Sequence, residues 1–162
     1  MQTVTEPTAQ TTTWVDAPPE KVWSLVSDVT RTGEWSPVCW NVEWLEPDIE
    51  PRVGARFRGH NKLNGVRWSR DCEVTAAEAG RRFGFSTLFK GRESTRWLYT
   101  LDAEDGGTRL TQAYQVVAIP LWVKLVRKLP GAMAKTERDM RWNMEQSLAR
   151  IKAQAEESAE VA

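Results

Sequence analysis

The sequence holds few of the residues on which metal and thiol chemistry depend. It contains one histidine, His60, and two cysteines, Cys39 and Cys72. A structural zinc site needs about four Cys or His ligands, and a disulfide-rich fold needs several cysteine pairs. We therefore predict neither a metal centre nor a cofactor, and we expect both cysteines to be reduced thiols in the core.

The chain also lacks an excess of charge and a long hydrophobic run. Its 22 basic residues cancel its 22 acidic residues, which argues against a protein that finds nucleic acid through overall charge. Residues 116–123 form the longest apolar run and Pro120 interrupts it, whereas a membrane span needs about 20 residues. Residues 1–13 have no basic and apolar segments typical of a secretory signal. We predict a soluble, cytoplasmic protein without a nucleic-acid partner.

Tryptophan, in contrast, is abundant, with nine residues in a chain of 162. A chain of this length suits one domain and buries roughly 70% of the surface that it exposes when unfolded. Each large ring adds much apolar area to the core. We predict one ligand-binding domain over residues 11–157, with a disordered N-terminal tail at 1–10 and a flexible tail at 158–162.

The first part of the chain predicts one strand followed by two short helices. Residues 11–16 have the pattern of a strand, and Ala17-Pro18-Pro19-Glu20 ends it. Proline and glutamate are both favoured in the first turn of a helix, and valines at helical spacing predict that this helix covers about 19–28. Ser36-Pro37 limits residues 30–35 to one further short helical turn.

Alternating apolar residues and turn signals predict six consecutive antiparallel strands after residue 37. Asn64-Gly65 favours a two-residue type I′ turn between paired strands. Similar signals come from Glu78-Ala79-Gly80, Lys90-Gly91 and Asp105-Gly106-Gly107. Because one face of each strand is apolar, the sheet needs a cover on that face. The predicted strands are 38–44, 53–62, 66–76, 81–89, 94–101 and 108–117.

The last third of the chain predicts the helices that provide this cover. Residues 121–129 form one amphipathic piece, and Pro130-Gly131 interrupts it. A longer helix then runs to about Glu157. An antiparallel sheet of seven strands curls because of its twist, so a curved sheet around one long helix can leave a volume between them. The apolar face of the long helix carries Met133, Met140, Met144, Leu148 and Ile151.

This order of elements resembles the helix-grip fold, an α+β fold in which a seven-stranded curved antiparallel sheet, with two short helices after strand 1, wraps around a long C-terminal helix. Several motifs accompany it: Asp16-Ala17-Pro18-Pro19-Glu20-Lys21-Val22-Trp23, Ser27-Asp28, Glu34-Trp35-Ser36-Pro37, Val53-Gly54-Ala55-Arg56-Phe57-Arg58-Gly59-His60-Asn61, Arg96-Trp97 with Tyr99, and Gly107-Thr108-Arg109-Leu110-Thr111. On these residues the chain is similar to the START/Bet v 1-like (SRPBCC) superfamily, specifically its bacterial polyketide cyclase/dehydrase and lipid-transport-like group. The similarity spans about residues 11 to 155.

The resemblance implies that the protein binds a hydrophobic small molecule, such as a lipid or a polyketide-like metabolite, in an internal cavity. Our first hypothesis is therefore a carrier or sensor. Large aromatic side chains with a few polar groups among them are typical of such a pocket. The residues that we expect to face the ligand are Trp44, Phe57, Asn61, Trp68, Arg70, Phe83, Phe85, Trp97, Tyr99, Tyr114, Met140 and Met144.

The resemblance also implies two alternatives. Some members of the group are aromatases or cyclases that act on a bound polyketide, although no shared catalytic motif identifies catalytic residues here. The candidate acid–base groups are Tyr99, Tyr114, Arg70 and Asp71, and Tyr and Arg would need a large pKa shift to transfer protons at neutral pH. A protein-interaction or toxin-like module would instead use residues 120–129 or the basic strand surface of residues 52–70, which carries Arg52, Arg56, Arg58, Lys62, Arg67 and Arg70.

Other features have simpler interpretations. We expect Arg56 and Arg58 to point outward and pair with Glu residues of neighbouring strands. His60 is out of phase with Phe57 and should face solvent, whereas Asn61 shares the phase of Phe57. Residues 120–129 mix apolar and basic side chains, which fits packing at the cavity mouth, a mobile gate or transient contact with a membrane surface. No pattern specifies an oligomeric state.

Overall fold

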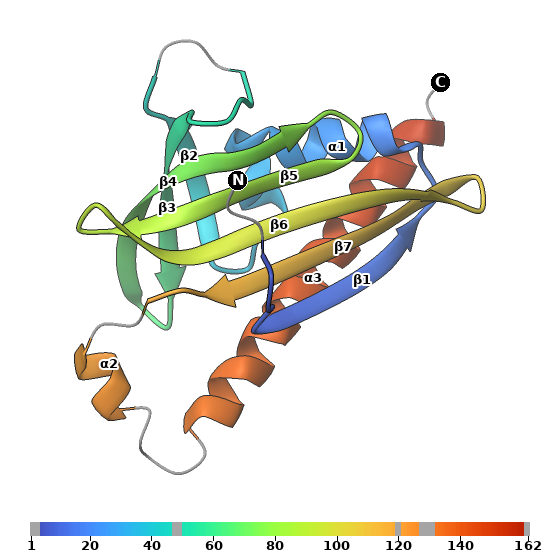
Figure 1. The fold of residues 1–162 in the computed structure, drawn as a ribbon. Coiled ribbons are helices and arrows are strands. Elements are labelled where there is room, and N and C mark those ends of the chain that lie inside the picture. The colour runs from blue at the N-terminus through green and yellow to red at the C-terminus, as the bar shows by residue number, and fades with distance from the viewer. Residues whose placement is uncertain (1–3, 47–49, 119–120, 127–131, 161–162) are drawn as a thin grey trace.

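The computed structural model of the protein describes residues 4–46, 50–118, 121–126 and 132–160. For residues 122–123, 126, 132–137 and 158–160 the backbone alone is described. Within these ranges the chain forms one curved antiparallel sheet, with a long helix along its open side (Figure 1). The predicted α+β helix-grip architecture is confirmed.

Within the described residues the sheet has seven strands, in the spatial order β1-β7-β6-β5-β4-β3-β2. Every pair of neighbours is antiparallel. β1 begins at Ala9, earlier than expected, because Ala9 and Gln10 pair with Tyr114 and Ala113. The strands are β1 (Ala9–Val15), β2 (Cys39–Trp44), β3 (Arg56–Leu63), β4 (Val66–Glu78), β5 (Arg82–Phe89), β6 (Arg92–Glu104) and β7 (Gly107–Val116).

Three hairpins close through the dipeptides that the sequence singles out. Asn64 and Gly65 join β3 to β4, with φ angles of 49° and 82°. Lys90-Gly91 and Asp105-Gly106 repeat this pattern of two positive φ angles between β5 and β6 and between β6 and β7. Two positive φ angles give a turn whose twist matches that of the strands it joins. These turns therefore fix the register that sends alternate residues to the concave face.

Two short helical segments close one end of the sheet. Helix α1 (Pro19–Ser27) begins with proline in its first turn and buries Val22, Leu25 and Val26. The 3₁₀ helix η1 (Val29–Glu34) follows after Asp28, whose carboxylate accepts a hydrogen bond from the Thr30 backbone N–H at 3.3 Å. Side-chain caps of this kind satisfy donors that a helix start leaves free. The two helices connect the first strand to the far edge of the sheet.

Helix α3 (Ala132–Glu160) packs its C-terminal half against β1 and α1, whereas its N-terminal end extends beyond the strands (Figure 1). Met144, Leu148, Ile151 and Ala155 are buried and recur every three or four residues, as on one helix face. Leu148, Ile151 and Ala155 join the core under the closed end of the sheet. Met133, expected on the same face, lies outside the described side chains. Helix α2 (Leu121–Val126) lies between β7 and α3 in the chain.

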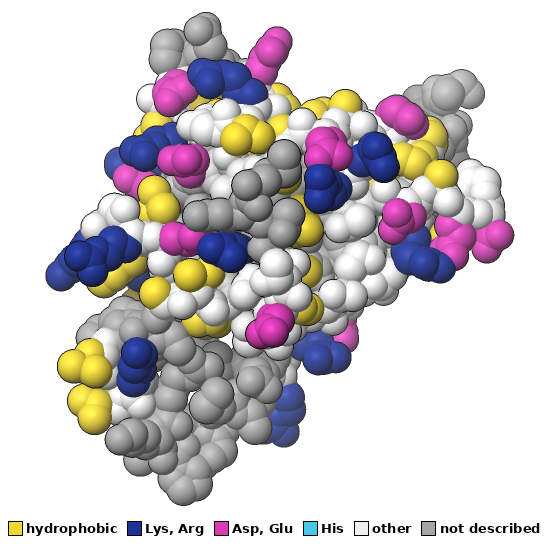
Figure 2. All heavy atoms as spheres, in the orientation of Figure 1, with side chains coloured by type: hydrophobic (Ala, Val, Ile, Leu, Met, Phe, Trp, Pro, Cys, Tyr) yellow, Lys and Arg dark blue, Asp and Glu magenta, His cyan; other side chains and the backbone are white. Residues whose placement is uncertain are grey.

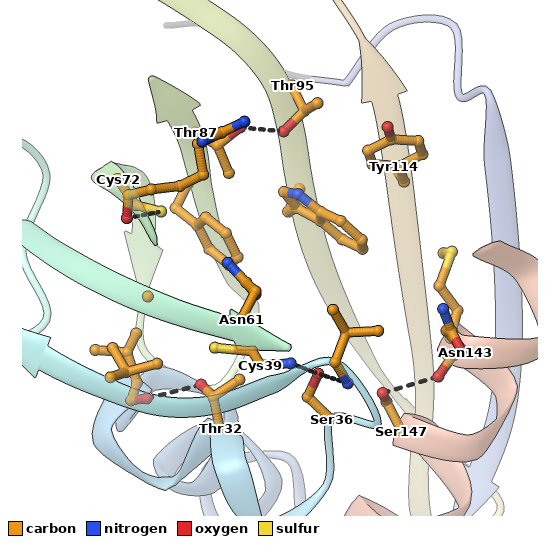
Figure 3. A pocket seen from close by; sticks show the side chains of 18 of the residues that line it. Thr32, Ser36, Cys39, Asn61, Cys72, Thr87, Thr95, Tyr114, Asn143 and Ser147 are labelled. Carbon is orange, nitrogen blue, oxygen red and sulfur yellow. Dashed lines mark hydrogen bonds between the residues drawn. The ribbon is translucent and has the colours of Figure 1, made fainter. Parts of the chain in front are cut away.

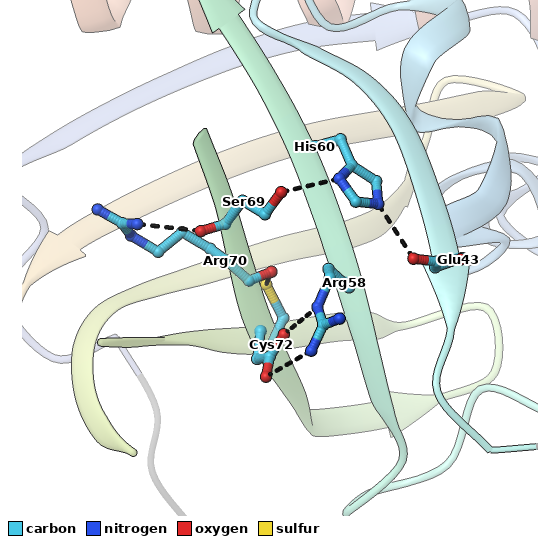
Figure 4. A network of polar contacts seen from close by, with 7 residues as sticks. Glu43, Arg58, His60, Ser69, Arg70 and Cys72 are labelled. Atoms are coloured by element: carbon cyan, nitrogen blue, oxygen red, sulfur yellow. Dashed lines mark hydrogen bonds and ion pairs between the residues drawn. The ribbon is translucent and has the colours of Figure 1, made fainter. Parts of the chain in front are cut away.

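The convex face of the sheet carries charged side chains of both signs, interspersed in Figure 2. Arg56 pairs with Glu73 at 3.1 Å and Arg58 with Asp71 at 2.6 Å. His60 also lies on this side, with Nε2 3.0 Å from Glu43 Oε1 (Figure 4). The outward direction predicted for Arg56, Arg58 and His60 is confirmed. No helix in the described ranges is long and apolar enough to cross a membrane.

Candidate functional site

A cavity of about 570 Å³ lies between the concave face of the sheet, η1 and α3 (Figure 3). Its wall is mainly apolar, with hydroxyl and amide groups at intervals. This volume falls within the range of small-molecule sites. Ala118, which follows β7, lines the cavity and is exposed, so the cavity reaches the surface at this end.

Aromatic rings from four strands form one wall of the cavity. Phe57 and Phe85 meet edge to face, with ring centroids 5.2 Å apart. Phe85 and Trp97 stack at an interplanar angle of 17°, and the ring centroids of Trp97 and Tyr114 lie 4.6 Å apart. Rings at these separations attract one another beyond simple area burial. The row presents a continuous apolar surface with stacked rings at its centre.

The deep end of the cavity is closed by three buried side chains, one directly after η1, one on β6 and one on β7. Trp35 is 2% exposed, and Tyr99 and Gln112 are nearly as buried. The Gln112 amide nitrogen donates to the Tyr99 hydroxyl at 3.1 Å, while the Gln112 carbonyl oxygen has no partner among the described residues. Burial raises the pKa of the Tyr99 phenol far above its usual value of 10. Tyr99 therefore stays protonated at physiological pH.

Three hydroxyl groups gather on the wall at the other end, near Ala118. The Thr87 hydroxyl lies 2.9 Å from that of Ser94. It lies 2.5 Å from that of Thr95 (Figure 3). The pairing of β5 with β6 shifts here, because Thr87 pairs with Thr95 but Leu88 pairs with Glu93. This β-bulge lets two consecutive residues, Ser94 and Thr95, line the cavity together. We call Thr87, Ser94 and Thr95 the hydroxyl cluster.

Arg70 brings a positive charge to this same wall. It is half-buried, and its guanidinium carbon lies 5.1 Å from the centroid of the Phe89 ring, which also lines the cavity. The guanidinium donates one hydrogen bond to the Ser69 carbonyl at 3.0 Å (Figure 4). Among the described lining residues Arg70 is the only charged side chain.

Both cysteines line the cavity as free thiols. Burial raises the pKa of Cys39 to about 11 and raises that of Cys72 further. The thiolate is the reactive form of cysteine, so both thiols are inert at neutral pH. In the part of the chain that the structure describes, no three His, Cys, Asp or Glu side chains gather as they would around a metal ion.

The structure places most of the side chains proposed from sequence on the cavity wall. Trp44 and Phe83 lie outside it. Phe83 is 0% exposed in the core where α1 covers β5, and Trp23 of α1 donates to the Arg82 carbonyl beside it at 3.0 Å. Trp44 packs edge to face on Phe57, with ring centroids 5.7 Å apart. The residues on the wall are Phe57, Asn61, Trp68, Arg70, Phe85, Trp97, Tyr99, Tyr114, Met140 and Met144.

Asp71, considered as an acid–base group, lies away from the cavity. It binds Arg58 on the convex face, and this hydrogen bond lowers the pKa of its carboxyl group. Strand alternation sends it outward, because its neighbours Arg70 and Cys72 point inward. A role for Asp71 in chemistry inside the cavity is therefore wrong.

Sequence reasoning missed most of the polar lining. Thr87, Thr95 and Gln112 share the phase of the aromatic residues on their own strands, so alternation alone would have found them. Two further lining residues, Asn143 and Ser147, lie three positions after Met140 and Met144 and share their helix face. Ser94 carried no such signal, because the bulge breaks the alternation. Other polar residues of the wall are Thr32 and Ser36.

Comparison with known proteins agrees with this geometry. The family model described as polyketide cyclase / dehydrase and lipid transport matches residues 6–156. The Polyketide_cyc-like protein Cgl2372 from Corynebacterium glutamicum is 29% identical, with a TM-score of 0.59 over 98% of this chain and 94% of that one. No curated protein matches the chain significantly.

Two further solved structures share the fold at lower identity. The di-domain ARO/CYC StfQ from the steffimycin biosynthetic pathway is 14% identical, with a TM-score of 0.73 over 93% of this chain and 51% of that one. Ara h 8.0201 is also 14% identical, with a TM-score of 0.61 over 91% of this chain and 95% of that one. At this identity the likeness concerns the fold.

Proposed function

Because the chain belongs to the polyketide cyclase/dehydrase and lipid transport family, we propose that it binds a hydrophobic small molecule in the cavity, as a carrier or sensor. The observation that carries this proposal is the cavity itself, about 570 Å³ of space walled mainly by apolar side chains. Burying an apolar ligand there removes its surface from water, which is the main driving force for such binding.

The chemistry of the wall supports binding over catalysis. General acid–base catalysis at neutral pH works best with a group whose pKa lies near 7. Burial keeps the Tyr99 phenol and both thiols protonated there. His60 points to the convex face, where it contacts Glu43 and Ser69. The alternative of an aromatase or cyclase would have to rely on polarisation by groups such as Arg70 and Tyr114.

Contact with a membrane surface through residues 120–129 remains a narrower proposal. In α2 the side chains of Leu121, Lys124 and Leu125 are exposed, and a mixed apolar and basic surface suits anionic lipid. The other side chains of this segment lie outside the described residues. The interaction-module alternative and the cytoplasmic location likewise remain predictions from sequence.

A cavity-filling variant tests the binding proposal. Gly59 lines the cavity from β3, and a Cβ atom there would meet only Cys39 Sγ, at 3.5 Å, an ordinary contact distance. Gly59→Leu should therefore project a side chain into the space that a ligand would occupy. The matched control is Lys62→Leu, on the same strand but with an exposed side chain.

The measurement is fluorescence titration with N-phenyl-1-naphthylamine, a neutral apolar probe. We expect binding to the wild type and to Lys62→Leu, and at least about tenfold weaker binding to Gly59→Leu, since a tenfold loss needs only 1.4 kcal/mol. Gly59→Leu should unfold in a cooperative thermal transition, which shows that the variant is folded. If the wild type binds neither this probe nor any of a panel of lipids and aromatic metabolites, the proposal is wrong. Native mass spectrometry of protein from its own source would identify the ligand.

A further inference from the structure

We propose that the ligand carries a carboxylate, which Arg70 binds at the outer end of the cavity while the apolar body lies along the aromatic wall. This inference rests on the proposed function and specifies the class of ligand. It follows from the charge of the wall, from the unused donors of Arg70 and from the hydroxyl cluster beside it.

The charge of the lining is unbalanced. No aspartate or glutamate is among its described residues, while Arg70 contributes a full positive charge. On the convex face, in contrast, Arg56 and Arg58 each bind a carboxylate. A half-buried cation without a counter-charge is costly, so such a group favours an anionic partner.

Arg70 has donors to spare and is held in place. A guanidinium group carries five N–H donors, and the described contacts of Arg70 with acceptors comprise one hydrogen bond, to the Ser69 carbonyl. Its guanidinium carbon lies over the Phe89 ring, and this cation–π contact restrains the side chain. Figure 4 shows the side chain turned away from the ion pair of Arg58. The free edge of the restrained guanidinium matches the two oxygens of a carboxylate.

The hydroxyl cluster lies next to Arg70 and can supply a further donor. Cys72 pairs with Thr87, and Asp71 pairs with Leu88, so Thr87 is a diagonal neighbour of Arg70 on the same face. Ser94 donates its proton to the Thr87 carbonyl at 3.1 Å. The Thr87 hydroxyl must then donate to Ser94, and Thr95 donates to Thr87, so a ligand oxygen would receive the Thr95 proton by replacing the Thr87 hydroxyl as its acceptor.

The position of these groups sets the orientation of the ligand. The backbone N–H groups of Val117 and Ala118 both donate to the Ser94 carbonyl, which places the hydroxyl cluster at the end of the cavity that reaches the surface. An anion held there keeps part of its hydration, so it loses less solvation than at the buried end near Tyr99. The apolar body then lies inward, against Phe85 and Trp97.

A pair of probes of almost equal shape tests this inference. 2-Naphthoate is an anion at pH 7, and 2-naphthamide is its neutral counterpart. Binding of both is measured by isothermal titration calorimetry to the wild type, Arg70→Gln, Arg70→Lys and the control Arg67→Gln. Arg67 lies on β4 as well, but its side chain is exposed and outside the cavity lining.

We expect the wild type and Arg67→Gln to bind naphthoate about tenfold more tightly than naphthamide, as for one charge-assisted hydrogen-bonded pair. Arg70→Gln should lower this ratio to about twofold or less, mainly by weakening naphthoate binding, because it removes the charge and keeps a polar side chain. Arg70→Lys should keep part of the preference, since it retains the charge without the planar fork.

A wild-type ratio near one, or a ratio that survives in Arg70→Gln, overturns the inference. In either case binding of naphthamide or N-phenyl-1-naphthylamine would leave the proposed function standing. Failure of the wild type to bind the neutral probes as well as naphthoate would count against the proposed function itself. The two failures are thus distinguishable.

Discussion

The side-chain N–H of Gln112 donates a hydrogen bond to the Tyr99 hydroxyl at 3.1 Å, at the deep end of the cavity, and in the part of the chain that the structure describes its carbonyl oxygen has no partner. Both residues are almost completely buried. A buried polar group that loses its partner costs about 1–3 kcal/mol. The Tyr99 hydroxyl is therefore what makes a glutamine tolerable at this position.

Replacing Tyr99 with phenylalanine should destabilise the protein. We expect Tyr99→Phe to lower the free energy of unfolding by about 1–3 kcal/mol, because both polar ends of the Gln112 amide would then be buried without partners. Urea denaturation measures this loss. Adding Gln112→Leu removes the stranded amide and should restore part of the lost stability. A double variant as unstable as the sum of the two single variants would contradict the assigned pairing.

A second prediction concerns the close approach of η1 to β2. A Cβ atom on Gly33 would lie 2.4 Å from the Trp40 carbonyl oxygen, whereas one on Gly59 would meet Cys39 Sγ at 3.5 Å. We expect Gly33→Ala to lower the free energy of unfolding by about 1–3 kcal/mol, as for overpacking against a rigid neighbour. Gly59→Ala should be neutral or slightly stabilising. Equal stability of the two variants in urea would show that η1 can move away from β2.

How far the sequence predicts this fold is clearest at its hairpins. Asn64-Gly65 and Asp105-Gly106 signal turns through their conformational preferences, which act locally and do not depend on the rest of the molecule. With the turns fixed, alternation places Phe57, Phe85 and Trp97 on one face. The concave aromatic wall is therefore readable from sequence.

The limits of the cavity are set by tertiary packing, which no local pattern encodes. Phe83 and Phe85 have the same phase, but α1 covers the end of β5 that holds Phe83, so only Phe85 reaches the cavity. The bulge at Ser94 reverses the alternation that would have placed it outside. Trp35 closes the deep end from the end of a 3₁₀ helix, where the sequence has no periodic signal.

The attachment of α3 to β1 gives a pH-dependent contribution to stability. Glu156 accepts a hydrogen bond from the Asp16 backbone N–H at 3.0 Å and pairs with Lys152 at 2.5 Å. The Asp16 bond, followed by that of Lys152, lowers the pKa of the Glu156 carboxyl group below its usual 4.5. Its folded-state pKa lies below its unfolded-state value, so this contribution is present above pH 4.5 and disappears as the pH falls through the folded-state pKa.

Glu156→Gln should accordingly destabilise the protein at pH 7 and do so less at acidic pH. We expect a loss of about 1 kcal/mol at pH 7, a modest value because the pair is partly exposed. Urea denaturation at a series of pH values from 7 to 3 gives the difference between variant and wild type. Glu157→Gln, at an exposed neighbouring position, is the control. A difference that stays constant down to pH 3 would rule out the carboxylate as its cause.

The contribution of the Cys39 thiol to stability depends on pH in the opposite direction. Burial raises the pKa of this thiol from the usual 9.0 to about 11, so the folded protein holds the thiol proton more tightly than the unfolded chain. The thiol contributes stability that is fully present below pH 9 and is lost as the pH rises from 9 to about 11. At pH 8 its thiolate fraction is roughly a hundredfold smaller than that of an unfolded thiol.

Alkylation by iodoacetamide measures this difference. In a Cys72→Ala background, we expect Cys39 to react at pH 8 roughly a hundredfold more slowly in the folded protein than in urea, because only the thiolate attacks. The folded-state rate should rise with pH until about 11. Since Cys39 lines the cavity, saturation with an apolar probe should slow the reaction further. Equal rates in the folded and unfolded states at pH 8 would mean that the thiol is not buried, and the wall at β2 would have to be open to water.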